Sequence, residues 1–143
     1  MRKRLIASLL ALAAALPAQA QEKPDLITIL TSTEPQTQLM SMVLTMQALQ
    51  QGSNTHILLC GPGGDLALKE APASATAPQE PKGMSPQGLM QMIIAKGGKV
   101  DVCAIYLPNK GVGADALIDG VGSAKPQPMA EKLLADNVRI MSF

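Results

Sequence analysis

The chain has 143 residues with 12 basic (Lys and Arg) and 11 acidic side chains, one Tyr, one Phe and no Trp. Nucleic-acid-binding proteins usually present a basic face, often with aromatic side chains that stack on bases, so this composition argues against that class. Since aromatic residues are so few, we expect Leu, Ile, Val, Ala and Met to fill the core.

The first 20 residues have the pattern of a cleavable signal peptide. The basic run Arg2, Lys3 and Arg4 precedes an apolar stretch at 5–16 and a small-residue A-x-A sequence at 18–20. That stretch is about 12 residues long, whereas a membrane-spanning helix needs about 20. We therefore expect a periplasmic or secreted protein that is free of the membrane after cleavage, with an uncleaved anchor as the alternative.

Cleavage after Ala20 would leave residues 21–143, which is the size of a single domain with one core. The three basic residues of the leader would leave with it. Nine basic side chains would then face 11 acidic ones, and the net charge would be near −2.

The first half of this domain predicts a strand, a helix and a second strand. Residues 26–30 are a run of strand length. Thr33 and Gln36 have the spacing of a capping box, and the helix that they predict repeats its apolar positions until Gly52. Residues 55–60 predict a second strand. The glycine-rich sequence at 61–64 is interpreted as a tight turn, because it lacks the Lys-Ser/Thr ending of a phosphate loop.

A flexible surface loop is expected at 71–82, where Ala, Pro, Ser and Gln dominate without periodicity. A helix should follow, with Ser85 as its N-cap, Pro86 in its first turn and its end at Gly97 and Gly98. The side chains expected to face inward from this helix are Leu89, Met92 and Ile93.

The remainder of the chain predicts two more strands and two short helices. Residues 100–107 are almost continuously apolar, as in a strand covered on both faces, and Pro108 should close that strand. Short helices are expected at about 114–118 and 128–135. The final strand is expected at 138–143.

Alternating strands and helices predict an α/β fold with a mainly parallel sheet. Four to five strands in one domain suit a small flavodoxin-like three-layer sandwich. In such open sheets the functional site lies beyond the carboxyl ends of the strands. The segments after residues 30, 60 and 107 are therefore the places to look for it.

Two cysteines, Cys60 and Cys103, lie in or at the end of predicted strands. One interpretation is a pair of buried, inert thiols, and an oxidising compartment would also permit a disulfide. In a flavodoxin-like strand order, however, the first strand separates the two strands that carry them. The cysteines would then be about 10 Å apart, beyond the ~7 Å limit for bridged Cα atoms. That order predicts no disulfide, whereas a different order would permit one.

The surroundings of Cys103 favour a reactive thiol. A nearby helix N-terminus and a cation such as Lys110 would stabilise the nucleophilic thiolate over the thiol. Cys103 and Lys110 are therefore the candidate catalytic residues. The residues expected to line their site are Cys60, Gly61, Asn109 and Gly111.

The segment KVDVCAIYLPNKG at 99–111 resembles the DsrE/DsrF-like sulfur-relay proteins, and the likeness extends over most of the chain. Its features are a cysteine in a mid-chain strand and a following basic-Gly pair, here Lys110 and Gly111. The resemblance implies a flavodoxin-like domain that assembles as a homotrimer or homohexamer. It also implies that Cys103 accepts sulfur as a persulfide, from a donor protein or for an acceptor protein, without a cofactor.

Two alternatives stay open. One is a non-catalytic oligomeric binding module in which both cysteines are inert. The other is soft-metal (copper) binding through Cys and Met, suggested by nine methionines. Methionines at helical spacing, such as Met42 and Met46, are more typical of core filling. His56, the single histidine, is interpreted as a structural residue, and no metal-ligand motif of the CxxC or HExxH type is present in the sequence.

Overall fold

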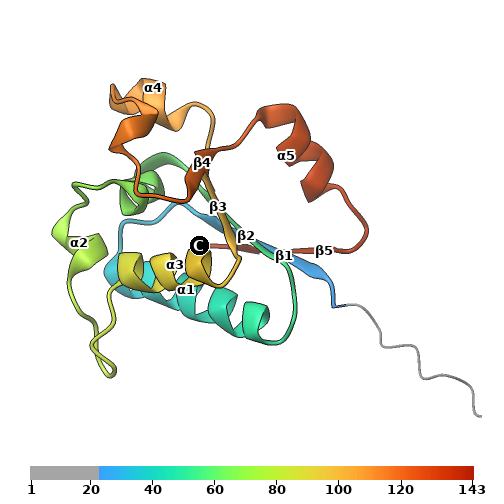
Figure 1. The fold of residues 1–143 in the computed structure, drawn as a ribbon, viewed down its shortest axis with the longest axis horizontal. Helices are drawn as coiled ribbons and strands as arrows, with labels where there is room; N and C mark the ends of the chain where they lie inside the picture. The colour runs from blue at the N-terminus through green and yellow to red at the C-terminus, as the bar shows by residue number, and fades with distance from the viewer. Residues whose placement is uncertain (1–22) are drawn as a thin grey trace, which may run out of the picture.

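The computed structural model describes residues 23–143, so the predicted signal peptide at 1–20 lies outside the described residues. Within the described part, five parallel strands form one sheet with helices on both faces (Figure 1). This confirms the predicted α/β class and three-layer arrangement. No helix between residues 23 and 143 is both long and apolar enough to cross a membrane.

The sheet has the order β4-β3-β2-β1-β5. Its strands are β1 (Asp25–Leu30), β2 (Thr55–Leu59), β3 (Lys99–Val102), β4 (Val121–Ser123) and β5 (Val138–Ser142). The helices are α1 (Pro35–Gln50), α2 (Ala73–Thr76), α3 (Pro86–Ala95), α4 (Tyr106–Lys110) and α5 (Pro126–Leu133), with two 3-10 helices, η1 (Gly61–Ala67) and η2 (Ala114–Ala116).

The strand order differs from the expected one, because β2 pairs directly with β3 instead of being separated from it by β1. The reason lies in the handedness of the connections. A right-handed crossover whose helix lies on one face of the sheet always moves the chain in the same direction. Since α1 and α3 pack together on one face, they carry the chain from β1 to β2 to β3 (Figure 1). Helix α5 lies on the other face and returns the chain to β5 beside β1.

The N-cap prediction was wrong for α1 and correct for α3. The predicted capping box at Thr33 is wrong: Glu34 is the N-cap of α1, and its carboxylate accepts hydrogen bonds from the backbone N–H groups of Gln36 and Thr37. The N-cap of α3 is Ser85, as predicted, and its hydroxyl accepts from the N–H of Gly88.

The predicted strand at 100–107 is too long. Strand β3 ends at Val102, and the chain then turns into α4, which contains Pro108. A short apolar run can belong to a strand or to a buried helical turn, and periodicity alone does not separate the two. Strand β4 was not foreseen, because it has three residues with a glycine in the middle.

Several other predicted elements differ from the structure in type or in their first residue. The segment at 71–82, expected as a loop, contains α2, whose Ala75 is fully buried. The helix expected at 114–118 is a single 3-10 turn, and α5 begins at Pro126 instead of residue 128.

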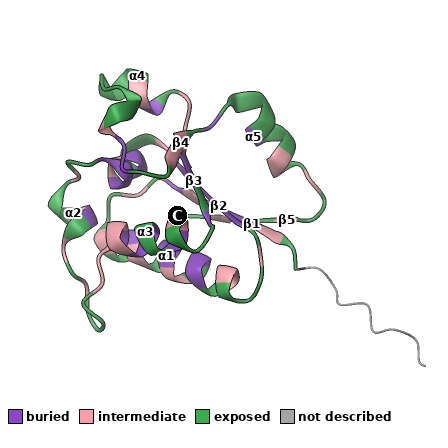
Figure 2. Cartoon of the chain, viewed as in Figure 1, coloured by how far each residue is buried: buried purple, intermediate pink, exposed green. Residues whose placement is uncertain are grey.

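The main core lies between the sheet and helices α1 and α3, and buried residues concentrate there (Figure 2). Ile57, Leu59 and Val102 from the strands meet Met42 and Ile93 from the helices. The expectation for Met92 is wrong, since its side chain is 46% exposed and Met90 is buried instead. Met42 and Met46 are core residues, as their helical spacing indicated.

A smaller apolar cluster covers the opposite face, under α5. It consists of Leu58, Ala124 and Met129, with Ile29, Cys60, Cys103 and Leu133 packed against it. The cysteines therefore lie on the α5 face of the sheet. Alternate residues of β2 and β3 point to this face, so His56 and Asp101 share it with them.

Replacing Ile57, which is fully buried in β2, tests the main core. We expect Ile57→Ala to lower the free energy of unfolding by about 2–5 kcal/mol, because it removes apolar contacts and leaves a cavity. Urea denaturation followed by circular dichroism measures this change. The control is Leu134→Ala, since Leu134 is 83% exposed and its truncation should change stability by less than about 0.5 kcal/mol. Equal effects of both variants would contradict the assignment of the core.

Candidate functional site

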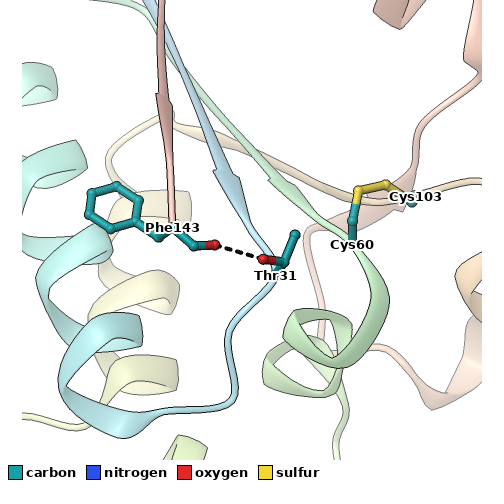
Figure 3. Close-up of a disulfide and its surroundings, with 4 residues drawn as sticks. All are labelled: Thr31, Cys60, Cys103 and Phe143. Atoms are coloured by element: carbon teal, nitrogen blue, oxygen red, sulfur yellow. Dashed lines mark hydrogen bonds between the residues drawn. A yellow bond between two sulfur atoms is a disulfide. The ribbon is translucent and has the colours of Figure 1, made fainter.

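The two cysteines lie side by side at the carboxyl ends of neighbouring strands and form a disulfide, Cys60–Cys103 (Figure 3). The sequence-based expectation of separated cysteines is therefore wrong. Because Leu59 of β2 lies opposite Val102 of β3, the residues that follow them are also neighbours, and their Cα atoms are 5.1 Å apart. That separation is within the usual range for a bridged pair.

Backbone hydrogen bonds hold both cysteines in place. The N–H of Cys60 donates to the carbonyl of Leu30 (3.0 Å), and the N–H of Cys103 donates to the carbonyl of Leu59 (2.8 Å). The cysteine carbonyls accept from the first turns of η1 and α4, through Gly63 and Tyr106. The sheet ladder thus continues through each cysteine before the chain turns away.

The neighbouring strands end at the same edge of the sheet. Thr31 directly follows β1, and both its N–H (2.8 Å) and its hydroxyl (2.9 Å) donate to the carbonyl of Phe143 (Figure 3). This edge is where open parallel sheets place their functional sites.

A pocket of about 460 Å³ lies between η1 and α4, the two segments that follow the cysteines. It is lined by Gly61, Pro62, Asp65, Ile105, Tyr106, Asn109 and Lys110. Three residues selected from the sequence, Gly61, Asn109 and Lys110, therefore meet here. Cys60, Cys103 and Gly111 are not among the lining residues. Gly111 ends α4 in the left-handed region (φ 74°), where glycine is favoured.

Lys110 pairs with a carboxylate that the sequence analysis did not identify. Asp65 Oδ1 accepts a hydrogen bond from Lys110 Nζ (2.8 Å) and another from the Tyr106 hydroxyl (2.7 Å). Asp65 and Tyr106 are 41 residues apart in the chain. The only local signal was the position of Asp65 directly after the glycine-rich turn.

The protonation states of this cluster follow from its contacts. Burial alone would raise the pKa of Asp65, but the hydrogen bonds from Lys110 and Tyr106 outweigh it and lower the pKa. Burial, followed by the hydrogen bond to Asp65, raises the pKa of Tyr106 well above its ordinary value. At neutral pH the cluster therefore contains an ionised Asp65 and a neutral Tyr106 phenol.

The glycine-rich turn allows the close approach of its neighbours. A Cβ atom at Gly64 would overlap the ring of Tyr106, and a Cβ atom at Gly63 would overlap the carbonyl of Leu30. The packing of η1 against β1 and α4 thus requires glycine at both positions. The segment expected as a tight turn is therefore the beginning of a 3-10 helix, η1 (Gly61–Ala67).

A second polar cluster lies on the α5 face. His56 Nε2 is 2.8 Å from Asp101 Oδ2, and Lys132 Nζ of α5 is 3.2 Å from His56 Nδ1. Since an ammonium group only donates, Nδ1 accepts from Lys132 and the imidazole is neutral, with its proton on Nε2. Burial, together with the charge of Lys132, lowers the pKa of His56 despite the hydrogen bond to Asp101. His56 was interpreted as a lone structural residue, because its partners are 45 and 76 positions away.

Neither polar cluster supplies a typical metal site. Within residues 23–143, no group of three or more His, Cys, Asp or Glu side chains is placed to hold a metal ion. In the disulfide, neither cysteine offers a thiolate ligand, and Met42 and Met46 are committed to the core.

Comparisons with known proteins show similarity in fold but not in sequence. No family model and no curated protein matches the chain. Among solved structures, the E. coli YchN protein matches with a TM-score of 0.64 and 19% identity, over 82% of this chain and 99% of YchN. The protein of unknown function MTH1491 from Methanobacterium thermoautotrophicum matches with a TM-score of 0.66 and 10% identity, over 85% of this chain and all of MTH1491. These likenesses show that the chain shares its α/β fold with both proteins.

Breaking the disulfide should destabilise the domain. The bridge joins residues 43 positions apart, and closing a loop of that length restricts the unfolded chain by up to about 4 kcal/mol. We therefore expect reduction to lower the free energy of unfolding by about 2–4 kcal/mol. Urea denaturation with and without dithiothreitol measures it. The double variant Cys60→Ser/Cys103→Ser should have the lower stability and no response to the reductant. An unchanged midpoint on reduction would show that the bridge does not constrain the chain.

Tyr106 offers a direct test of the pocket, because it is the only tyrosine in the chain. In a titration followed by phenolate absorbance, we expect ionisation well above the ordinary pKa of about 10, since burial and Asp65 both disfavour the phenolate. Asp65→Asn removes the nearby negative charge and should lower the pKa of Tyr106. Asp119→Asn is a control at an exposed position. An ordinary pKa in the folded wild-type protein would contradict the cluster, with circular dichroism confirming that the protein remains folded.

Proposed function

We propose that this chain is a thiol-based sulfur carrier in which Cys103 holds the sulfur and Cys60 is its partner thiol. The main support is the position of the two cysteines: they are adjacent at the carboxyl edge of the sheet, directly before the two segments that form the pocket. The resemblance of residues 99–111 to sulfur-relay proteins supports the same chemistry, and YchN shares the fold.

Loading begins with reduction of the disulfide, because a bridged cysteine has no thiolate. A dithiol donates two electrons and two protons, the bond between the sulfurs of Cys60 and Cys103 breaks, and the dithiol becomes a disulfide. The Cys103 thiolate then attacks the outer sulfur of a persulfide donor. A new sulfur–sulfur bond forms on Cys103, the donor's bond breaks, and the donor leaves as a thiolate.

Unloading can follow two routes. An acceptor thiolate attacks the outer sulfur and leaves Cys103 as a thiolate. Alternatively, the Cys60 thiolate attacks Cys103 Sγ, so the disulfide re-forms and hydrosulfide leaves with the outer sulfur. The 5.1 Å separation of the two Cα atoms makes this second route geometrically accessible.

The pocket would receive the donor or acceptor group. Ile105, which is 71% exposed, offers an apolar contact two residues after Cys103. The Lys110 side chain is 41% exposed, so it has the freedom to exchange its contact with Asp65 for one with an anionic sulfur species. Asp65 would hold Lys110 in the unloaded state.

This role is proposed for a periplasmic or secreted protein that assembles as a homotrimer or homohexamer. The predicted leader supports export. A disulfide is also the form expected for an adjacent cysteine pair in an oxidising compartment.

The disulfide also supports a second candidate, an oligomeric binding module in which the bridge is purely structural. The bridge connects two strand ends and its cysteines are half-buried against the cluster under α5. In that case, the cysteines contribute stability and have no sulfur chemistry.

Mass spectrometry after treatment with a small organic persulfide separates the two candidates. We expect reduced Cys60→Ser to retain an adduct of about 32 Da per sulfur on Cys103, because it lacks the partner thiol that would release hydrosulfide. Reduced Cys103→Ser should hold no stable adduct. Reduced wild-type protein should release sulfide and return to the disulfide, and the oxidised wild-type protein is the unreactive control.

Two other results would contradict the proposal as stated. An adduct retained on Cys60 but not on Cys103 would reverse the assigned roles. No adduct on either single variant, combined with thiols that resist alkylation, would overturn the carrier and support the binding module.

A further inference from the structure

A second pocket, of about 200 Å³, lies on the α5 face and is separate in its lining residues from the pocket between η1 and α4. Strands β2 and β3 form its floor, and α5 with the segment leading into it forms its wall. The polar side chains that line it are His56, Lys99, Asp101, Ser123, Lys125 and Lys132. The lining thus contains three lysines and one carboxylate.

That carboxylate is already engaged. Asp101 hydrogen bonds with His56 at 2.8 Å, and Lys99 Nζ is 3.5 Å from the same oxygen. Both contacts are to Oδ2, and no side chain within residues 23–143 pairs with Oδ1, so the single negative charge of Asp101 stands against three lysines of the lining.

The remaining two lysines have no anionic partner among the described residues. Lys132 donates to the neutral His56 imidazole, and Lys125 forms no ion pair within residues 23–143. An anion that enters the pocket would meet a net positive lining, in which Asp101 is the one opposing charge.

The pocket also has a buried, preorganised part. His56 is 3% exposed and Asp101 is 6% exposed, and the hydrogen bond between them fixes the imidazole orientation. Lys132 reaches His56 from α5, so its ammonium group is held at the pocket instead of extending into solvent. The Ser123 hydroxyl at the end of β4 adds a further donor.

We propose that this pocket binds a small doubly charged oxyanion of the sulfate or phosphate class between Lys99, Lys125 and Lys132. The ion would connect α5 and the segment before it to β3. This proposal does not depend on the cysteine chemistry, and the disulfide-bonded protein is the form to be tested.

The single histidine provides a local readout by NMR, because its ring signals need no assignment. Sodium sulfate is the probe and sodium chloride at equal ionic strength is the control. We expect the His56 ring signals to shift and saturate with sulfate but not with chloride. The pKa of His56 should rise at saturating sulfate, since the anion offsets the charge of Lys132.

Charge-removing variants locate the ion. Lys125→Gln and Lys132→Gln should each weaken sulfate binding about tenfold, as expected for losing one charge-assisted contact. The Lys125 side chain is exposed and forms no hydrogen bond or ion pair within residues 23–143, so its variant should remain folded even if Lys132→Gln disturbs α5. Lys96→Gln is the matched control, because Lys96 is an exposed lysine at the end of α3, on the opposite face.

A linear response to sulfate that chloride reproduces would overturn the proposal. So would saturable binding that Lys125→Gln leaves unchanged, because the ion would then lie elsewhere. Equal weakening by Lys96→Gln would show general charge screening instead of a site, and would also overturn it.

Discussion

Strand β2 pairs in parallel with β3 over four residue pairs, from His56 opposite Lys99 to Leu59 opposite Val102, and both candidate sites depend on this register. At the carboxyl end it brings Cys60 beside Cys103, and therefore η1 beside α4. At the amino end it brings His56 beside the Lys99–Asp101 segment. A shift of one residue would move these side chains to the opposite face of the sheet and separate the residues of both clusters.

Each of the two polar clusters contains one carboxylate, and the two carboxylates have different partners. Asp65 accepts from a phenol and an ammonium group near the surface, so its charge is compensated while Lys110 keeps part of its freedom. Asp101 is buried, and its main hydrogen-bond partner is a neutral imidazole. Because that imidazole also accepts from Lys132, positive charge accumulates on the α5 side. The first cluster suits exchange of partners, and the second suits capture of an anion.

The cysteine pair changes the chemical interpretation of the chain. From the sequence, Cys103 was a single reactive thiol assisted by Lys110. In the structure, it shares a disulfide with Cys60, while Lys110 pairs with Asp65. A sulfur carrier with this arrangement needs a reductant before loading, and it has an internal route for release. The same bridge is expected to stabilise the domain, so its chemistry and stability are coupled.

By itself, the sequence determined the α/β class, the existence of the main helices and the ends of several elements, because these follow from local periodicity and capping, as at Ser85. It also identified Gly61, Asn109 and Lys110, which line one pocket. Only the tertiary structure decided the strand order, the disulfide and the partners of Lys110 and His56. These depend on which face each crossover helix occupies, and that choice is made by packing between α1 and α3, which no local pattern records.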